Sequence, residues 1–204
     1  PAKVVSGDFY NFSDLGNNKF GFGVADVSGK GIKSSLLMSK ASSLYRCLSK
    51  TIFSASSLLK ILNDEICETT TRGMFVTMIV GVYDKNKNEL LLSNAGHEPP
   101  LIFSSHGNFK TVDEAGPPLG IAPNFKFTEQ IISFKESSMY IFTDGITEMK
   151  NTNGDMLGQE GFQDYIKKYQ STPNNKRLQK IIEDLISSGR IQKDDLTIVS
   201  VDGK

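Results

Sequence analysis

The sequence predicts an α+β domain in which helices cover a mainly antiparallel β-sheet core. Three observations predict this class: two helical periodicities early in the chain, a succession of short apolar runs in the middle, and two further helical periodicities before a final strand. No linker-like stretch divides the 204 residues, and this length suffices for one full hydrophobic core. We therefore expect a single domain over residues 1–204.

The first expected elements are a strand and a helix joined by a glycine turn. Apolar residues alternate with Gly and Ala from Phe20 to Ser28, a strand pattern that stops at the turn 29–31. Helical spacing of apolar residues then runs over Ile32–Leu48. This spacing places Leu36 on the buried face and Ser34 on the solvent face.

A second helix is expected directly after the first. Ser54 or Ser56 is suited to cap its N-terminus, and Gly73 is suited to end it. Its core side is predicted to consist of Leu58, Leu59, Leu62 and Ile66.

The middle of the chain is rich in β-forming residues. Phe75–Tyr83 and Glu89–Ser93 are joined by the polar turn 84–88, which is typical of an antiparallel hairpin. Further apolar runs, each bounded by Gly, Pro, Asn or Ser, lie at Leu101–Phe103, Phe109–Val112, Phe125–Phe134 and Met139–Thr143. A succession of strands this close together predicts a sheet-dominated core.

The last part of the chain returns to helical periodicity. Apolar residues at helical spacing lie within Phe162–Tyr169 and within Leu178–Leu185, and a polar stretch separates the two segments. Leu196–Val201 then reads as a closing strand.

Composition and charge exclude several functional classes. Lys+Arg and Asp+Glu are equal at 23 each, so the chain carries no basic field for nucleic acid. No apolar run is long enough to span a bilayer, and the first residues show no signal-peptide pattern. We expect a cytoplasmic domain with no nucleic-acid partner and no membrane insertion.

Aspartates at the ends of predicted strands, or in turns beside them, are the candidates for chemistry. They are Asp8, Asp26, Asp144 and the pair Asp194 and Asp195. Each alone is ordinary turn chemistry, but rigid strands beside glycines can direct several such side chains to one point. Crowded carboxylates repel one another unless a cation binds among them, and hard oxygen ligands suit Mg²⁺ or Mn²⁺.

Five short strings carry a family resemblance. They are the segments at 1–10 (PAKVVSGDFY), 25–31 (ADVSGKG), 93–100 (SNAGHEPP), 116–120 (GPPLG) and 143–145 (TDG), and the string DDLT at 194–197 agrees with them. In this order they resemble the SpoIIE/RsbU-type bacterial serine/threonine phosphatases, a group of the type 2C metal-dependent (PPM) phosphatases. The resemblance covers almost the whole chain.

The resemblance implies a fold and a set of ligands. The fold is a two-layer antiparallel β-sandwich flanked by helices, with two Mn²⁺ or Mg²⁺ ions between the sheets. Asp26 would bridge both ions, and Asp8 with the backbone carbonyl of Val27 would hold one of them. Asp144 would hold the other ion, so that Asp26 and Asp144 are the expected catalytic residues.

One ligand stays open at this stage. The resemblance places Asp194 at the second ion, and Asp195 is the alternative because two successive aspartates cannot be told apart by pattern.

The resemblance also implies an activity and partners. The expected reaction is hydrolysis of phosphoserine or phosphothreonine on a regulatory protein by a metal-activated water, with an anti-anti-sigma (STAS) protein as substrate. The chain would then be the C-terminal part of a larger regulator of sigma factors and the stress response. We expect it to lack the first strand of that domain, to follow a sensor domain, and to be compatible with a homodimer.

A non-catalytic reading is the alternative. In it, the chain is a phosphatase-like signalling module that binds a partner without turnover. Two further residues in the quoted strings each have two candidate roles. We expect His97 to make structural hydrogen bonds rather than act in catalysis, and Lys30 to be a solvated turn residue rather than a phosphate contact.

Overall fold

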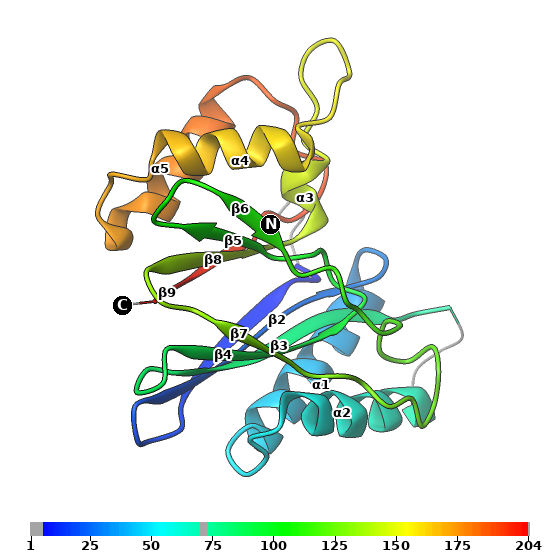
Figure 1. Cartoon of the computed structure of the whole chain (residues 1–204). Helices are drawn as coiled ribbons and strands as arrows, with labels where there is room; N and C mark the ends of the chain where they lie inside the picture. Colours follow the sequence, from blue (N-terminus) through cyan, green and yellow to red (C-terminus); the bar gives the residue numbers. More distant parts are fainter. Residues whose placement is uncertain (1–5, 70–72, 204) are drawn as a thin grey trace.

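The chain folds into two facing β-sheets, each with helices on its outer side (Figure 1). The computed structural model describes residues 6–69 and 73–203. Every strand pair in both sheets is antiparallel. This arrangement confirms the predicted two-layer antiparallel β-sandwich flanked by helices.

The first sheet has the strand order β1-β2-β3-β4-β7. Its strands are β1 (Phe9–Asp14), β2 (Lys19–Val27), β3 (Val76–Asp84), β4 (Glu89–Ala95) and β7 (Gln130–Ser133). The predicted hairpin is confirmed as β3 and β4, in which Asp84 pairs with Glu89. β1 was not predicted as a strand, because it is an edge strand whose alternate residues, including Tyr10 and Phe12, are partly or fully exposed.

The second sheet has the strand order β6-β5-β8-β9. Its strands are β5 (Leu101–Ser104), β6 (Phe109–Thr111), β8 (Ser137–Phe142) and β9 (Ile198–Asp202). The predicted strand over Phe125–Phe134 is wrong in extent, since only its end forms β7. Phe125 and Phe127 lie in a loop instead and pack edge-to-face on each other against the α1 and α2 layer.

The inner core lies between the two sheets. Side chains from the first sheet, such as Phe22 and Ile79, pack with Met139 and Ile141 from the second. Phe22 is directly opposite Gly81 in the β2–β3 register, and a Cβ atom at Gly81 would lie 2.2 Å from the Phe22 ring. The glycine therefore lets the ring cross its neighbouring strand, and burial of these apolar side chains holds the layers together.

Helices α1 (Ile32–Leu48) and α2 (Ala55–Thr69) cover the outer face of the first sheet. The bounds of α1 match the prediction, and Ser54 Oγ accepts a hydrogen bond from the backbone N–H of Ser57 at the start of α2. The predicted core side of α2 is confirmed, since Leu58, Leu59, Leu62 and Ile66 are all buried.

The predicted buried face of α1 is partly wrong. Ile32 and Leu36 are 77% and 67% exposed, whereas Ser34 is buried. The buried residues follow the helical spacing Ser34, Leu37, Ala41 and Tyr45. Ser34 is accommodated in the interior because its hydroxyl donates to the carbonyl of Gly31 at 2.8 Å.

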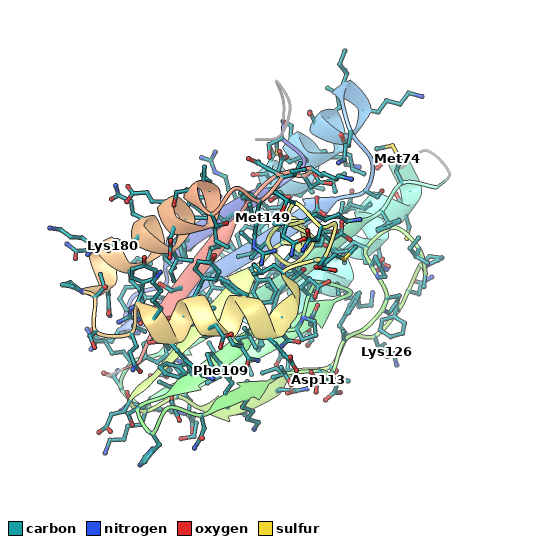
Figure 2. All side chains as sticks on the ribbon, turned by 90° about the horizontal axis from the view of Figure 1, so that it is seen from above. Met74, Phe109, Asp113, Lys126, Met149 and Lys180 are labelled. Atoms are coloured by element: carbon teal, nitrogen blue, oxygen red, sulfur yellow. The ribbon has the colours of Figure 1, made fainter. Side chains whose placement is uncertain are left out.

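Helices α3 (Asp144–Thr147), α4 (Gly158–Lys168) and α5 (Asn174–Ser187) lie over the second sheet (Figures 1 and 2). The two predicted late helices correspond to α4 and α5, while the single turn of α3 was not predicted. No helix in the described part of the chain is long and apolar enough to cross a membrane.

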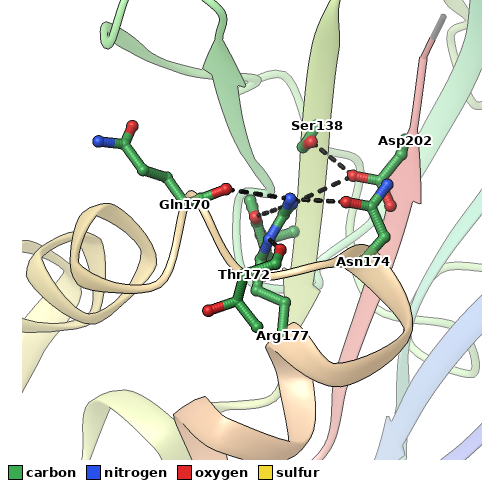
Figure 3. Close-up of polar contacts among 7 residues, drawn as sticks. Ser138, Gln170, Thr172, Asn174, Arg177 and Asp202 are labelled. Atoms are coloured by element: carbon green, nitrogen blue, oxygen red, sulfur yellow. Dashed lines mark hydrogen bonds and ion pairs between the residues drawn. The ribbon is translucent and has the colours of Figure 1, made fainter.

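Arg177 anchors α5 to the second sheet (Figure 3). Its guanidinium donates to the Tyr140 hydroxyl at 2.9 Å and to Asp202 at 3.3 Å, on β8 and β9. The same side chain donates to the Asn174 side chain and to the Gln170 carbonyl in the α4–α5 connection. These bonds fix the outer layer on β8, which precedes Asp144, and on β9, which follows Asp194.

Candidate metal centre

Asp8 and Asp26 lie beside each other at one end of the first sheet. Asp26 is the next-to-last residue of β2, and Asp8 immediately precedes β1. Because Phe9 pairs with Ala25 in the antiparallel register, the preceding and following residues share the same sheet end. A Cβ atom added to Gly7 would lie 3.2 Å from the carbonyl oxygen of Val27, so that carbonyl faces the segment that carries Asp8.

Asp144 enters the same region from the second sheet. It follows β8 and opens α3. The intervening residue, Thr143, is buried, and its hydroxyl donates a 2.8 Å hydrogen bond to Asp8 Oδ2. A Cβ atom at Gly145 would lie 1.9 Å from the carbonyl oxygen of Asp195, so only glycine permits this close approach.

The two candidates before β9 have different surroundings. Asp194 lines the cleft described below, together with Asp26 and Asp144. Asp195 is buried, and its Oδ2 accepts a 2.9 Å hydrogen bond from the backbone N–H of Gly7. Asp194 is therefore the residue of the pair that faces the cleft, while Asp195 fixes the segment before Asp8.

A cleft of about 340 Å³ opens where these segments meet. Asp26, Asp144 and Asp194 contribute carboxylates to its wall. The sequence did not predict a role at the site for five other lining residues, which are Ser28, Phe75, Thr77, Gly96 and Glu98. Glu98 belongs to one of the family strings, but nothing in its spacing distinguishes it from a turn residue.

The carboxylates raise one another's pKa. Burial, followed by the charge of Asp8, raises the pKa of Asp26 to about 8. Burial, followed by the charges of Glu148 and Asp194, raises the pKa of Asp144 to about 6. Burial also raises the pKa of Asp8, against the hydrogen bonds from Thr197 and Thr143. Ionised together, these groups repel, and a bound cation would remove that repulsion.

The residues present fit a hard divalent cation by their chemistry. Every candidate donor is an oxygen, from carboxylates and one backbone carbonyl, as Mg²⁺ and Mn²⁺ prefer. Within residues 6–69 and 73–203, no group of three or more His, Cys, Asp and Glu side chains is spaced to hold a single ion. The fit therefore rests on the donor set and on the crowding of Asp26 by Asp8, Asp144 and Asp194.

His97 lines the cleft but has the surroundings of a structural residue. It is buried, its Nδ1 lies 3.1 Å from Thr77 Oγ1, and its backbone N–H donates to Asn94 Oδ1 at 2.8 Å. Burial lowers its pKa to about 4, which the nearby carbonyl of Phe142 offsets only in part. These contacts agree with the expected structural role.

Lys30 differs from its expectation as a solvated turn residue. Its ammonium lies 2.6 Å from Asp194 Oδ2 and donates to the carbonyl of Lys193 at 3.0 Å. The sequence of the turn 29–31 does not indicate that Lys30 bonds to Lys193, which lies 163 positions further along the chain.

Comparisons with known proteins identify the family of the chain. The model of the family "Stage II sporulation protein E (SpoIIE)" matches residues 16–204. The chain is 30% identical to the phosphoserine phosphatase RsbU of Bacillus subtilis (strain 168) over 202 residues, which is 98% of this chain and 60% of that protein. The chain therefore spans less than two thirds of the length of this relative.

Solved structures show the same fold at low identity. The PP2C domain of SiaA from Pseudomonas aeruginosa superposes with a TM-score of 0.87 at 17% identity, covering all of this chain and 83% of that one. RsbX, solved in complex with magnesium, superposes with a TM-score of 0.72 at 18% identity, covering 97% of this chain and 87% of that one. From its fold and the match over residues 16–204, the chain belongs to the SpoIIE family of PP2C-fold domains.

Proposed function

We propose that this chain is a metal-dependent phosphatase that hydrolyses phosphoserine or phosphothreonine on a regulatory protein. The observation that carries the proposal is the meeting of Asp26, Asp144 and Asp194, from three separate segments, at one cleft of a SpoIIE-family domain, with Asp8 beside Asp26. The relative RsbU is named as a phosphoserine phosphatase, which supports the same reaction here.

The ligand assignment follows the placement of each side chain. Asp26 holds the central position, because the charges of Asp8, Asp144 and Asp194 all act on it. We assign Asp8 and the carbonyl of Val27, which faces the segment of Gly7, to one ion, and Asp144 with Asp194 to the other. Asp195 is assigned a positioning role through Gly7. Two Mg²⁺ or Mn²⁺ ions bound there would activate water and neutralise charge on the phosphoryl oxygens.

In this proposal, the side chains of the chain orient the reacting groups, and none of them forms a covalent bond to the phosphoryl group. Phosphoryl transfer gains most from orientation and electrostatic stabilisation, so a preorganised set of carboxylates can dominate without a side-chain nucleophile. Thr143 holds Asp8, and Gly145 allows the segment with Asp144 to touch the segment with Asp195. The substrate we propose is a phosphorylated STAS-domain protein of the anti-anti-sigma type.

The test is phosphate release from a phosphorylated STAS-domain protein in the presence of Mn²⁺. We expect release by the wild-type chain, and a loss of at least about a hundredfold in Asp26→Asn and Asp144→Asn. Asp164→Asn, which changes an exposed aspartate on α4, is the matched control and should keep the wild-type rate. Mn²⁺ binding without hydrolysis of any phosphoprotein would favour the non-catalytic module instead.

A further inference from the structure

Lys30 links the turn before α1 to the turn before β9. Its Nζ lies 2.6 Å from Asp194 Oδ2 and donates to the backbone carbonyl of Lys193 at 3.0 Å. Asp194 Oδ1 accepts a 2.9 Å bond from the backbone N–H of Asp195. Both oxygens of this carboxylate thus have protein partners, and one of those partners is a full positive charge.

The cleft wall is acidic apart from Lys30. Among the described residues that line it, the carboxylates are those of Asp26, Glu98, Asp144 and Asp194, and Lys30 supplies the one ammonium or guanidinium group. A lysine side chain is protonated at neutral pH, and this ammonium lies 2.6 Å from Asp194 Oδ2. The ammonium therefore partly neutralises the carboxylate group that we assign to metal binding.

A divalent cation at Asp194 must compete with this ammonium. Both seek the same carboxylate oxygens, and a bound ion would repel the lysine at short range. Because the ammonium belongs to the same chain as Asp194, it competes with the divalent ion at any protein concentration. Its side chain and that of Asp194 are each 38% exposed, so water screens the attraction and an incoming ion can displace the ammonium.

We propose that Lys30 is a tethered counter-cation of the metal centre, which occupies Asp194 in the absence of metal and lowers the affinity of the site for divalent ions. The proposal rests on the proposed function, since it assigns Asp194 to the metal. It makes Lys30 a positioning residue that sets the cation concentration at which the site fills. A turn lysine with a purely structural role would have the opposite effect, because its removal would loosen Asp194 and weaken metal binding.

The test is calorimetric titration of the chain with Mn²⁺, without substrate. Lys30→Met removes the charge and keeps most of the side-chain length, and we expect it to bind Mn²⁺ about threefold to tenfold more tightly than the wild type. Lys30→Arg retains the charge and should bind as the wild type does. Lys33→Met is the matched control, because it removes a lysine charge from an exposed position in the first turn of α1, outside the cleft wall.

The outcomes separate this inference from the proposed function. If the wild type binds Mn²⁺ and releases phosphate, but Lys30→Met binds equally or more weakly, the counter-cation role is overturned and the phosphatase stands. An equal gain in affinity in Lys33→Met would overturn it too, since the effect would then be one of net charge. If neither the wild type nor Lys30→Met binds Mn²⁺, the metal centre itself is wrong.

Discussion

The hydroxyl of Thr143 donates a 2.8 Å hydrogen bond to Asp8 Oδ2 and so connects the two sheets at the edge of the candidate metal centre. The hydroxyl oxygen of Thr143 also accepts a 3.2 Å hydrogen bond from the backbone N–H of Thr197. One buried hydroxyl therefore joins the start of β1, the end of β8 and the segment before β9. A residue that binds neither metal nor substrate in our account thus determines where a ligand lies.

Thr143→Val tests this role, because valine has the same shape without the hydroxyl. We expect a loss of about 1–3 kcal/mol in the free energy of unfolding, since the buried partners at Asp8 and Thr197 each lose a bond. Urea denaturation measures the change. Thr128→Val, at an exposed position, is the control and should change the free energy by less than about 0.5 kcal/mol. Equal effects of the two variants would contradict the bridging role.

Asp194 and Asp195 should respond differently to the same isosteric change. Asp194→Asn removes a carboxylate from the cleft wall, so we expect it to abolish Mn²⁺ binding at one of the two positions. Asp195→Asn weakens the hold on Gly7 and should lower thermal stability while both ions still bind. Calorimetry with Mn²⁺ and a thermal melt, run on both variants, measure this. Loss of metal binding in Asp195→Asn alone would reverse the assignment.

Gly145→Ala should be among the most damaging alanine substitutions in the chain. The added Cβ would lie 1.9 Å from the backbone carbonyl of Asp195, and backbone on both sides has little freedom to move. We expect a loss of about 2–4 kcal/mol in stability. In Gly21→Ala, the control, the new Cβ would meet only the Leu15 side chain at 3.4 Å. If urea denaturation shows the two variants to be equally stable, the close approach is wrong.

Because His97 is buried, we expect the free energy of unfolding to depend on pH. Its folded pKa of about 4 lies below the ordinary value of 6.5, because burial disfavours the charged ring. Above pH 6.5 both states are neutral and the effect is absent. As the pH falls from 6.5 to 4, the unfolded state takes up a proton that the folded state does not, so the free energy of unfolding decreases.

His97→Gln removes this contribution. Between pH 7 and pH 4.5, we expect the wild type to lose about 2 kcal/mol more stability than the variant does. Urea denaturation across this pH range, with His106→Gln in an exposed turn as the control, measures the difference. If the free energy of unfolding changes with pH equally in the wild type and in His97→Gln, the prediction is wrong, because the ring then takes up its proton as readily in the folded state as in the unfolded state.

Much of the fold was predictable because it depends on local pattern. The bounds of α1, the core side of α2 and the β3–β4 hairpin all follow from short-range periodicity and turn residues. The buried face of α1 did not, since Leu36 is exposed and Ser34 is buried. Hydrophobicity alone cannot show that a serine hydroxyl will find a carbonyl within its own helix turn.

The candidate site was also predictable only in part: its residues could be named from the sequence, but their contacts could not. The aspartates carry recognisable strings, and the sequence therefore names them without showing where each side chain points. The choice between Asp194 and Asp195 depends on a hydrogen bond to Gly7, 188 positions away. The contact of Lys30 with Asp194 likewise depends on how two turns from different sheets approach each other. Such long-range relationships leave no local signal in the chain.

The central claim is that Asp8, Asp26, Asp144 and Asp194 together hold divalent ions. Its most direct test is a crystal of the protein soaked in Mn²⁺ and measured at the manganese absorption edge. The account predicts anomalous peaks within about 2.4 Å of Asp26 oxygens, with Asp8 beside one peak and Asp144 and Asp194 beside the other. A fully soaked crystal with no peak at these carboxylates, or with manganese only at other places on the protein, would contradict it.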